Sequence, residues 1–207
     1  MNARVQQWIL VRVLVMLFIL SLAYFVYGNV QSGIPIGDLI ANTLLLAVPL
    51  ALLFWMIGLV VEAWRVRRAG CQLTGGLARF IYFAPRIGGV VVALFTGLFA
   101  LDVFDMEGSL WMKIGAFLIH AAPALIMLAL VALAWWREWI GALIFGLGAL
   151  FFLRTVIPRG MYAFGNLLLF VLPMALVAVL FWLNWRWRGE LRRERLAARE
   201  PRKGTGE

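Results

Sequence analysis

The stretch WMKIGAFLIHAAPALIMLALVALAWWREWIGALIFGLGALFFL, residues Trp111–Leu153, decides the fold of this chain. Its charged residues are Lys113, Arg137 and Glu138. As a single helix its 43 residues would extend about 65 Å at about 1.5 Å per residue, roughly twice the ~30 Å hydrocarbon core of a bilayer. The stretch is therefore predicted to reverse near Trp135–Trp139 and to form two membrane-spanning helices.

The composition of the whole chain supports a membrane environment. Apolar residues make up 64% and charged residues 14% of the 207 residues, whereas soluble domains average roughly 45–50% and 25%. In hydrocarbon, backbone polar groups are satisfied within helices or closed β-barrels. The apolar runs far exceed a barrel strand of about ten residues, so the predicted fold is an all-α, polytopic transmembrane helical bundle.

Six apolar stretches are long enough to be spans. They are Trp8–Tyr27, Leu39–Trp64, a stretch from Phe80 or Ile87 to Leu101, Trp111–Ala134, Trp139–Val156 and Asn166–Trp185. The first is expected to be an uncleaved signal anchor, because it is too long for a signal-peptide core and no small-x-small cleavage site follows it. Residues 1–70 are predicted to form a two-span hairpin, residues 71–185 a four-span membrane domain, and residues 186–207 a basic cytoplasmic tail.

The basic residues between the spans favour one orientation. Lys and Arg in short loops mark the cytoplasmic side, and here they alternate with the spans. With the amino end inside, the inner segments carry Arg4, Arg65, Arg67, Arg68, Arg79, Arg137 and the tail, and the outer segments carry Lys113, Arg154 and Arg159. Both ends of the chain are therefore predicted to be cytoplasmic.

The net charge of +9 is concentrated at the carboxyl end, since eight of the nineteen basic residues follow Asn184. That distribution suits contact with anionic lipid headgroups and does not indicate a nucleic-acid partner. The expected headgroup contacts are Arg186, Arg188, Arg192, Arg193, Arg195 and Arg199.

Polar residues within the spans are costly and are therefore candidates for function. The candidate intramembrane site consists of His120, Asp102, Thr96 and Arg86. His120, the single histidine, is either a proton-relay or ligand-orienting residue or a neutral side chain bonded to a neighbouring helix, for example to Thr96. Arg86 is expected to reach the interface by snorkelling or, if its span begins at Phe80, to pair with Glu62 or Glu138.

The chain offers little for catalysis. One histidine and one cysteine, Cys71, exclude an intramolecular disulfide and a haem held by two histidines of this chain. No Ser-His-Asp spacing, paired intramembrane carboxylates or Gly-rich phosphate loop after a strand is present in the sequence. We expect no catalytic site, no cofactor and no metal site.

Five pieces between Arg79 and Trp185 resemble a known family. They are the Arg86 segment, FALDVF (Phe99–Phe104), LIHAAP (Leu118–Pro123), ALAWWREWIGALIFG (Ala132–Gly146) and LFWLNW (Leu180–Trp185). Together they resemble a group of small bacterial four-span integral membrane proteins known only as a domain of unknown function. An additional Arg137 separates the aromatic residues from the acid of the central turn. The resemblance implies a fold and a bacterial plasma membrane, and no mechanism.

Three hypotheses for function remain. The first is a non-enzymatic accessory or structural subunit that packs against other membrane subunits or against itself. The second is a small transporter or channel with a polar site near His120 and Asp102, and the third is a membrane enzyme. Small residues that let helices approach recur in two stripes, Gly89, Ala93 and Gly97, and Ala142, Gly146 and Ala149. The sequence leaves open whether these stripes face another span or another protein.

Overall fold

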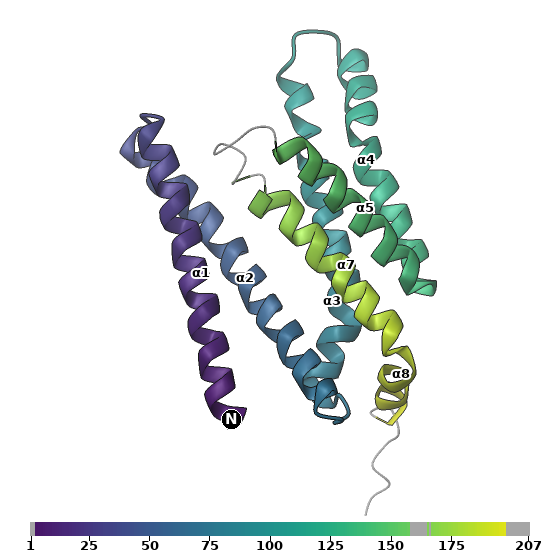
Figure 1. Cartoon of the computed structure of the whole chain (residues 1–207). Coiled ribbons are helices and arrows are strands. Elements are labelled where there is room, and N and C mark those ends of the chain that lie inside the picture. Colours follow the sequence, from purple (N-terminus) through teal and green to yellow (C-terminus); the bar gives the residue numbers. More distant parts are fainter. Residues whose placement is uncertain (1–2, 158–164, 166, 198–207) are drawn as a thin grey trace, which may run out of the picture. The chain divides into compact units, whose positions relative to one another are not determined.

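The structure, a computed structural model, describes residues 3–157, 165 and 167–197, and these residues form helices and turns without a strand. Figure 1 shows their order. The seven α-helices are α1 (Ala3–Gln31), α2 (Ile36–Arg68), α3 (Gly75–Leu98), α4 (Leu110–Trp136), α5 (Glu138–Val156), α7 (Leu172–Arg186) and α8 (Arg188–Ala197). A short 3-10 helix, η1 (Leu101–Asp105), follows α3, and a π-helical turn, η3 (Leu167–Val171), precedes α7.

Six helical segments are long and apolar enough to cross a membrane. They are Trp8–Gln31, Ile36–Arg68, Gly75–Asp105, Leu110–Trp136, Glu138–Val156 and Leu167–Arg186. The prediction of an all-α chain with six candidate spans is therefore confirmed. The cytoplasmic location of both ends stays a prediction. The expected reversal near Trp135 is also confirmed, since Arg137 alone separates α4 from α5.

The chain divides into two compact units. One consists of Met1–Gln72 with Leu150–Leu172, and the other of Leu73–Ala149 with Pro173–Glu207. The first unit holds α1, α2 and the end of α5, and the second holds α3, α4, most of α5, α7 and α8. The second unit therefore includes most of the four later spans and the basic helix that follows them.

In the first unit, α1 and α2 form an antiparallel hairpin (Figure 1). The Phe18 and Phe54 rings meet edge to face, with centroids 6.3 Å apart. Leu14 lies against Gly58, where an added Cβ would be 3.2 Å from the leucine methyl group. Gly58 therefore allows the two backbones to approach closely.

The two helices of this hairpin end in the same way. Gly33 has φ +69° and donates to the Val30 carbonyl at 3.0 Å, and Gly70 has φ +76° and donates to the Arg67 carbonyl at 3.1 Å. Cys71 also donates to the Val66 carbonyl at 3.1 Å. These are Schellman turns, which need a left-handed residue after the helix, and glycine adopts that conformation without strain.

In the second unit, α3 packs against α4, α5 and α7 through glycines. A Cβ added at Gly89 would lie 2.9 Å from Val131 on α4 and 3.2 Å from Phe145 on α5. A Cβ added at Gly88 would lie 3.0 Å from Val177 on α7. The first small-residue stripe therefore faces other spans of the same chain.

The second stripe faces α7. A Cβ added at Gly146 would be 3.9 Å from the Ala178 methyl group. Nearby, the Phe145 and Phe181 rings stack with centroids 5.9 Å apart and an interplanar angle of 19°. Gly141 lies directly under the Phe181 ring, so α5 and α7 approach each other at a glycine.

The start of the third helix differs from the sequence expectation. The helix begins at Gly75, ahead of both Phe80 and Ile87, and continues through Pro85. Proline inside a helix removes one backbone hydrogen bond. A side chain from α7 replaces that bond, as described below.

The predicted basic tail begins with a helix of its own. A turn at Trp187 separates α7 from α8. Trp187 and Leu191 are buried, and α8 contacts α3. Two buried apolar side chains one helical turn apart give α8 a side that packs against the bundle.

A pair of glycines on α5 tests this packing. At Gly141 an added Cβ would lie 2.7 Å from the Phe181 ring, which is fully buried, whereas at Gly146 the nearest atom is at 3.9 Å. Gly141→Ala is expected to destabilise the protein by about 1–3 kcal/mol, the usual cost of overpacking. Gly146→Ala should be neutral or slightly stabilising, because alanine favours helix. Thermal unfolding in detergent compares the two, and equal melting temperatures would contradict this packing.

Candidate functional site

Three buried polar side chains from separate helices meet in the second unit. Arg86 is 2% exposed, Glu138 5% and Asn184 1%. Arg86 lies within α3, Glu138 is the first residue of α5, and Asn184 is near the end of α7. We refer to these three residues as the polar cluster.

The Arg86 guanidinium pairs with the Glu138 carboxylate. Nη2 of Arg86 is 3.6 Å from Oε1 of Glu138, and the two side chains are 2% and 7% exposed. Nη1 donates to the carbonyl of Tyr82, one turn earlier on α3. The guanidinium carbon also lies 4.2 Å from the centroid of the Tyr82 ring and 5.8 Å from that of Trp135. An arginine suits this place because its flat, weakly hydrated cation both pairs with a carboxylate and stacks on rings.

The sharp turn between α4 and α5 brings the partners of Arg86 together. Arg137, with φ −132° and ψ 84°, is the single residue between the two helices. Trp135 and Glu138 lie on either side of it, so one turn supplies both a ring and a carboxylate to α3. Arg86 therefore does not reach the interface by snorkelling. Instead it pairs with Glu138, one of the two acids that the sequence offered as partners.

Asn184 compensates for the proline in α3. Because Pro85 has no N–H, the carbonyl of Ile81 lacks the usual donor four residues later. Nδ2 of Asn184 donates to the Ile81 carbonyl and to the Tyr82 carbonyl, both at 3.0 Å. An unsatisfied buried carbonyl costs about 1–3 kcal/mol, so the asparagine allows α3 to pass through Pro85 unbroken. Sequence reasoning missed this residue, although a polar residue within LFWLNW was a signal.

The other sequence-predicted site residues lie elsewhere. Nδ1 of His120 donates to the Ala116 carbonyl at 2.9 Å, and Thr96 donates to the Val92 carbonyl at 2.9 Å. Both bonds stay within the donor's own helix, so His120 and Thr96 do not bond to each other. The choice between a relay role and a structural role for His120 stays a prediction. Exposed side chains on a helix commonly bond to the carbonyl four residues earlier. Asp102 is exposed in η1.

The predicted lipid contacts are partly described. Arg186, Arg188, Arg192 and Arg193 are exposed on α7 and α8. Arg195 belongs to α8, but the structure does not describe its side chain, and Arg199 lies outside the described residues.

Among the described residues, no group of three His, Cys, Asp or Glu side chains is placed to hold a metal ion.

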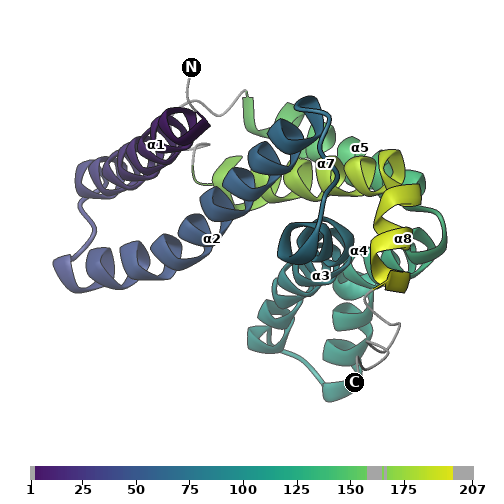
Figure 2. The ribbon, with the colours of Figure 1, turned by 90° about the horizontal axis from the view of Figure 1, so that it is seen from below.

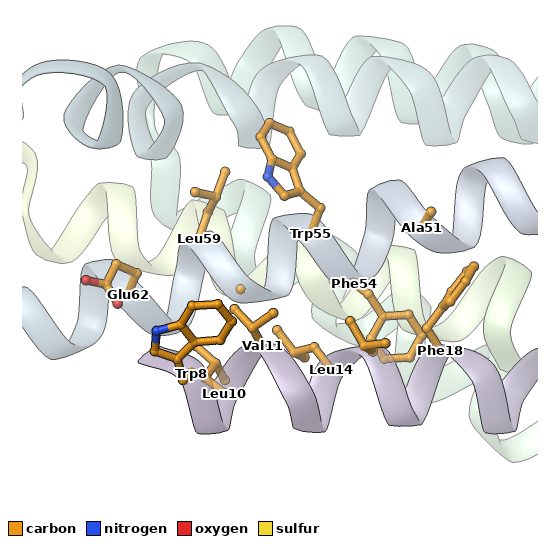
Figure 3. A pocket seen from close by; sticks show the side chains of 12 residues that line it. Trp8, Leu10, Val11, Leu14, Phe18, Ala51, Phe54, Trp55, Leu59 and Glu62 are labelled. Atoms are coloured by element: carbon orange, nitrogen blue, oxygen red, sulfur yellow. The ribbon is translucent and has the colours of Figure 1, made fainter. Parts of the chain in front are cut away.

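A groove of about 740 Å³ lies between α1 and α2. Figure 3 shows Trp8, Phe18 and Phe54 along it, with Glu62 toward one end. Its walls are otherwise apolar, so it suits hydrocarbon and contains no arrangement of groups for chemistry.

The bond between Asn184 and the carbonyl freed by Pro85 can be tested by paired substitutions. Asn184→Leu should lower stability by about 1–3 kcal/mol, because it leaves the Ile81 carbonyl unsatisfied. Pro85→Ala returns a backbone N–H, so Pro85→Ala/Asn184→Leu should recover at least half of that loss. Thermal unfolding in detergent measures all three variants. A double variant no more stable than Asn184→Leu would show that the asparagine serves another purpose.

Comparison with known proteins adds a family. A family model described as a domain of unknown function (DUF7670) matches residues 74–197, which include the polar cluster and α8. No curated protein and no solved structure matches the chain. The matched residues cover more than half of the chain. The chain therefore belongs to the DUF7670 family, whose function is unknown.

Proposed function

We propose that this chain is a non-enzymatic accessory or structural subunit that packs against another chain of a larger complex in the bacterial plasma membrane. The observation that carries the proposal is the position of His120. Its side chain is exposed on α4, in a helix apolar and long enough to span the membrane.

His120 lies at mid-membrane depth if α4 spans the bilayer. It follows Leu110, the first residue of α4, by ten residues, which is about 15 Å at 1.5 Å per residue. The hydrocarbon core is about 30 Å thick. A polar ring exposed to lipid at this depth is costly, whereas the same ring against a partner helix can form a hydrogen bond across the interface.

The surface around His120 suits a neighbouring helix. Ile119 is 74% exposed beside it, and a Cβ added at Gly115 would meet nothing within 4 Å. Gly115 lies one turn before Ile119, on the side of α4 next to His120. A glycine there lets another backbone approach, which is the usual way that membrane helices associate. Nδ1 of His120 is bonded to the Ala116 carbonyl, and this fixes the ring so that Nε2 is the atom offered to a partner.

The transporter hypothesis receives less support. It requires several of Asn42, Thr43, Thr96, His120 and Asn166 around one cavity. None of the first four lines the groove between α1 and α2, Asn166 lies outside the described residues, and Thr43 donates to the Leu39 carbonyl of its own helix at 2.7 Å. The buried charges of the polar cluster pair with each other, which favours a structural role for them over transport or catalysis.

Crosslinking in living cells tests the proposal. A photoreactive side chain at Ile119 should capture one distinct membrane protein in a stoichiometric complex. The matched control is Leu147, which is 57% exposed nine residues into α5 and should capture only lipid. His120→Gln should keep the complex, because glutamine also donates and accepts at similar reach. His120→Leu should lose it while the melting temperature stays within a few degrees, because the Ala116 carbonyl keeps its helical bond.

Two results would overturn the proposal. One is crosslinking from Ile119 confined to this chain itself. The other is a complex that His120→Leu leaves intact. A His120→Gln variant that is stable and fully assembled but has lost its cellular phenotype would instead favour the transporter hypothesis, because glutamine does not titrate near neutral pH.

A further inference from the structure

Helix α8 is fastened to the start of α3 by two carboxylates. The backbone N–H of Leu73 donates to Glu190, and that of Gly75 donates to Oε1 of Glu194 at 3.0 Å. Leu191, between the two acids, is 3% exposed, and Trp187 is 8% exposed. These four side chains of residues 187–194 form what we call the docked side of α8.

The docking follows from the requirements of α3. The first N–H groups of a helix have no partner within it, and the positive end of the helix dipole favours carboxylates. Thr74, the N-cap residue of α3, forms no capping bond with its own side chain. Glu194 supplies one of the missing acceptors, at Gly75, and Glu190 accepts from Leu73 just before the N-cap. Both acids come from more than a hundred residues away, and together they hold α8 in one orientation.

Two of the described arginines of α8 lie opposite the docked side. At about 100° per residue, Arg188 and Arg192 project away from Glu190 and Glu194. Arg193 lies at the edge of that side, about 60° from Glu190, and all three arginines are exposed. We call these three residues the arginine face. The acids of this short helix therefore point to the protein, and Arg188 and Arg192 point outward.

The arginine face lies where a membrane surface is expected. Helix α7 ends at Arg186 and α8 begins two residues later, so α8 follows a candidate span directly. Trp182 and Trp185, which are 40% and 41% exposed, precede it, and tryptophan is enriched at membrane interfaces. Figure 2 looks nearly along α3 and shows α8 along its length, so α8 runs across the direction of α3.

We propose that docked α8 presents a preorganised arginine face that binds the phosphate-bearing headgroups of anionic phospholipids. Docking fixes the helix that carries the three arginines beside the end of a span, so the backbone loses little conformational freedom when they bind. Guanidinium groups match phosphate geometry. Affinity then depends on the docked position of α8 as well as on its charge, which distinguishes this site from a loose basic tail.

The experiment uses the full-length chain in micelles of a mild detergent with phosphatidylcholine. Phosphatidylglycerol is titrated, and bound lipid is counted by native mass spectrometry. Arg188→Gln/Arg192→Gln/Arg193→Gln should weaken phosphatidylglycerol binding at least about tenfold, since each basic residue near a membrane surface contributes roughly fivefold. The matched control is Arg4→Gln/Arg202→Gln/Lys203→Gln, which removes the same charge outside α8 and should weaken binding less than about threefold.

A variant of the docking acids separates docking from charge. Glu190→Ala/Glu194→Ala removes both acceptors and makes the segment more positive by two charges, so simple attraction predicts tighter binding. Release of α8 predicts weaker binding, which is the expected result. Melting temperatures identify any variant that has lost its fold, and the surface arginine variant tests the proposal even if the acid variant does not fold.

Three results would overturn this inference. The first is tighter phosphatidylglycerol binding by a folded acid variant. The second is an equal loss in the matched control and the arginine variant. The third is an arginine variant that retains the lipid but loses a co-purifying acidic protein, which would assign the arginine face to a protein partner.

Discussion

The ion pair between Arg86 and Glu138 fixes how the second unit is assembled. A buried charge in an apolar medium is tolerated only when it is paired and bonded, and Arg86 is 2% exposed. Its pairing requires the first residue of α5 to lie against α3. This position of α5 requires the one-residue turn at Arg137, and the turn places Trp135 beside the Arg86 guanidinium. Three helices are thus constrained by one arginine, and α7 joins them through Asn184.

The same requirement, that buried polar groups find partners, explains the other unusual features. Pro85 removes a donor from α3, and Asn184 on α7 replaces it. The start of α3 lacks a cap from Thr74, and α8 supplies acceptors. In each case a side chain distant in sequence completes the backbone of α3. Helix α3 is therefore the element on which α4, α5, α7 and α8 converge, and residues 74–197 of the family match enclose this whole arrangement.

Sequence analysis predicted the six spans and the reversal near Trp135, because a membrane-spanning helix needs a run of about 20 apolar residues and such runs are visible in the sequence. It also included Glu138 among two acids that could pair with Arg86. It missed Asn184, since the need for that residue arises from a proline about a hundred positions away. It left two roles open for His120 and did not anticipate the bond of the ring to the Ala116 carbonyl of the same helix. Contacts set by tertiary packing, such as the docking of α8 onto α3, leave no periodic pattern in the chain.

The most direct measurement of this account is a double-mutant cycle on the ion pair, read as unfolding free energy in detergent. Glu138→Leu and Arg86→Met should each cost about 3–5 kcal/mol, because each leaves one buried charge without its partner. The combined variant should cost far less than the sum, since it removes both charges together and replaces them with apolar side chains. Strictly additive losses would show that the pair does not hold the helices together and would contradict the account.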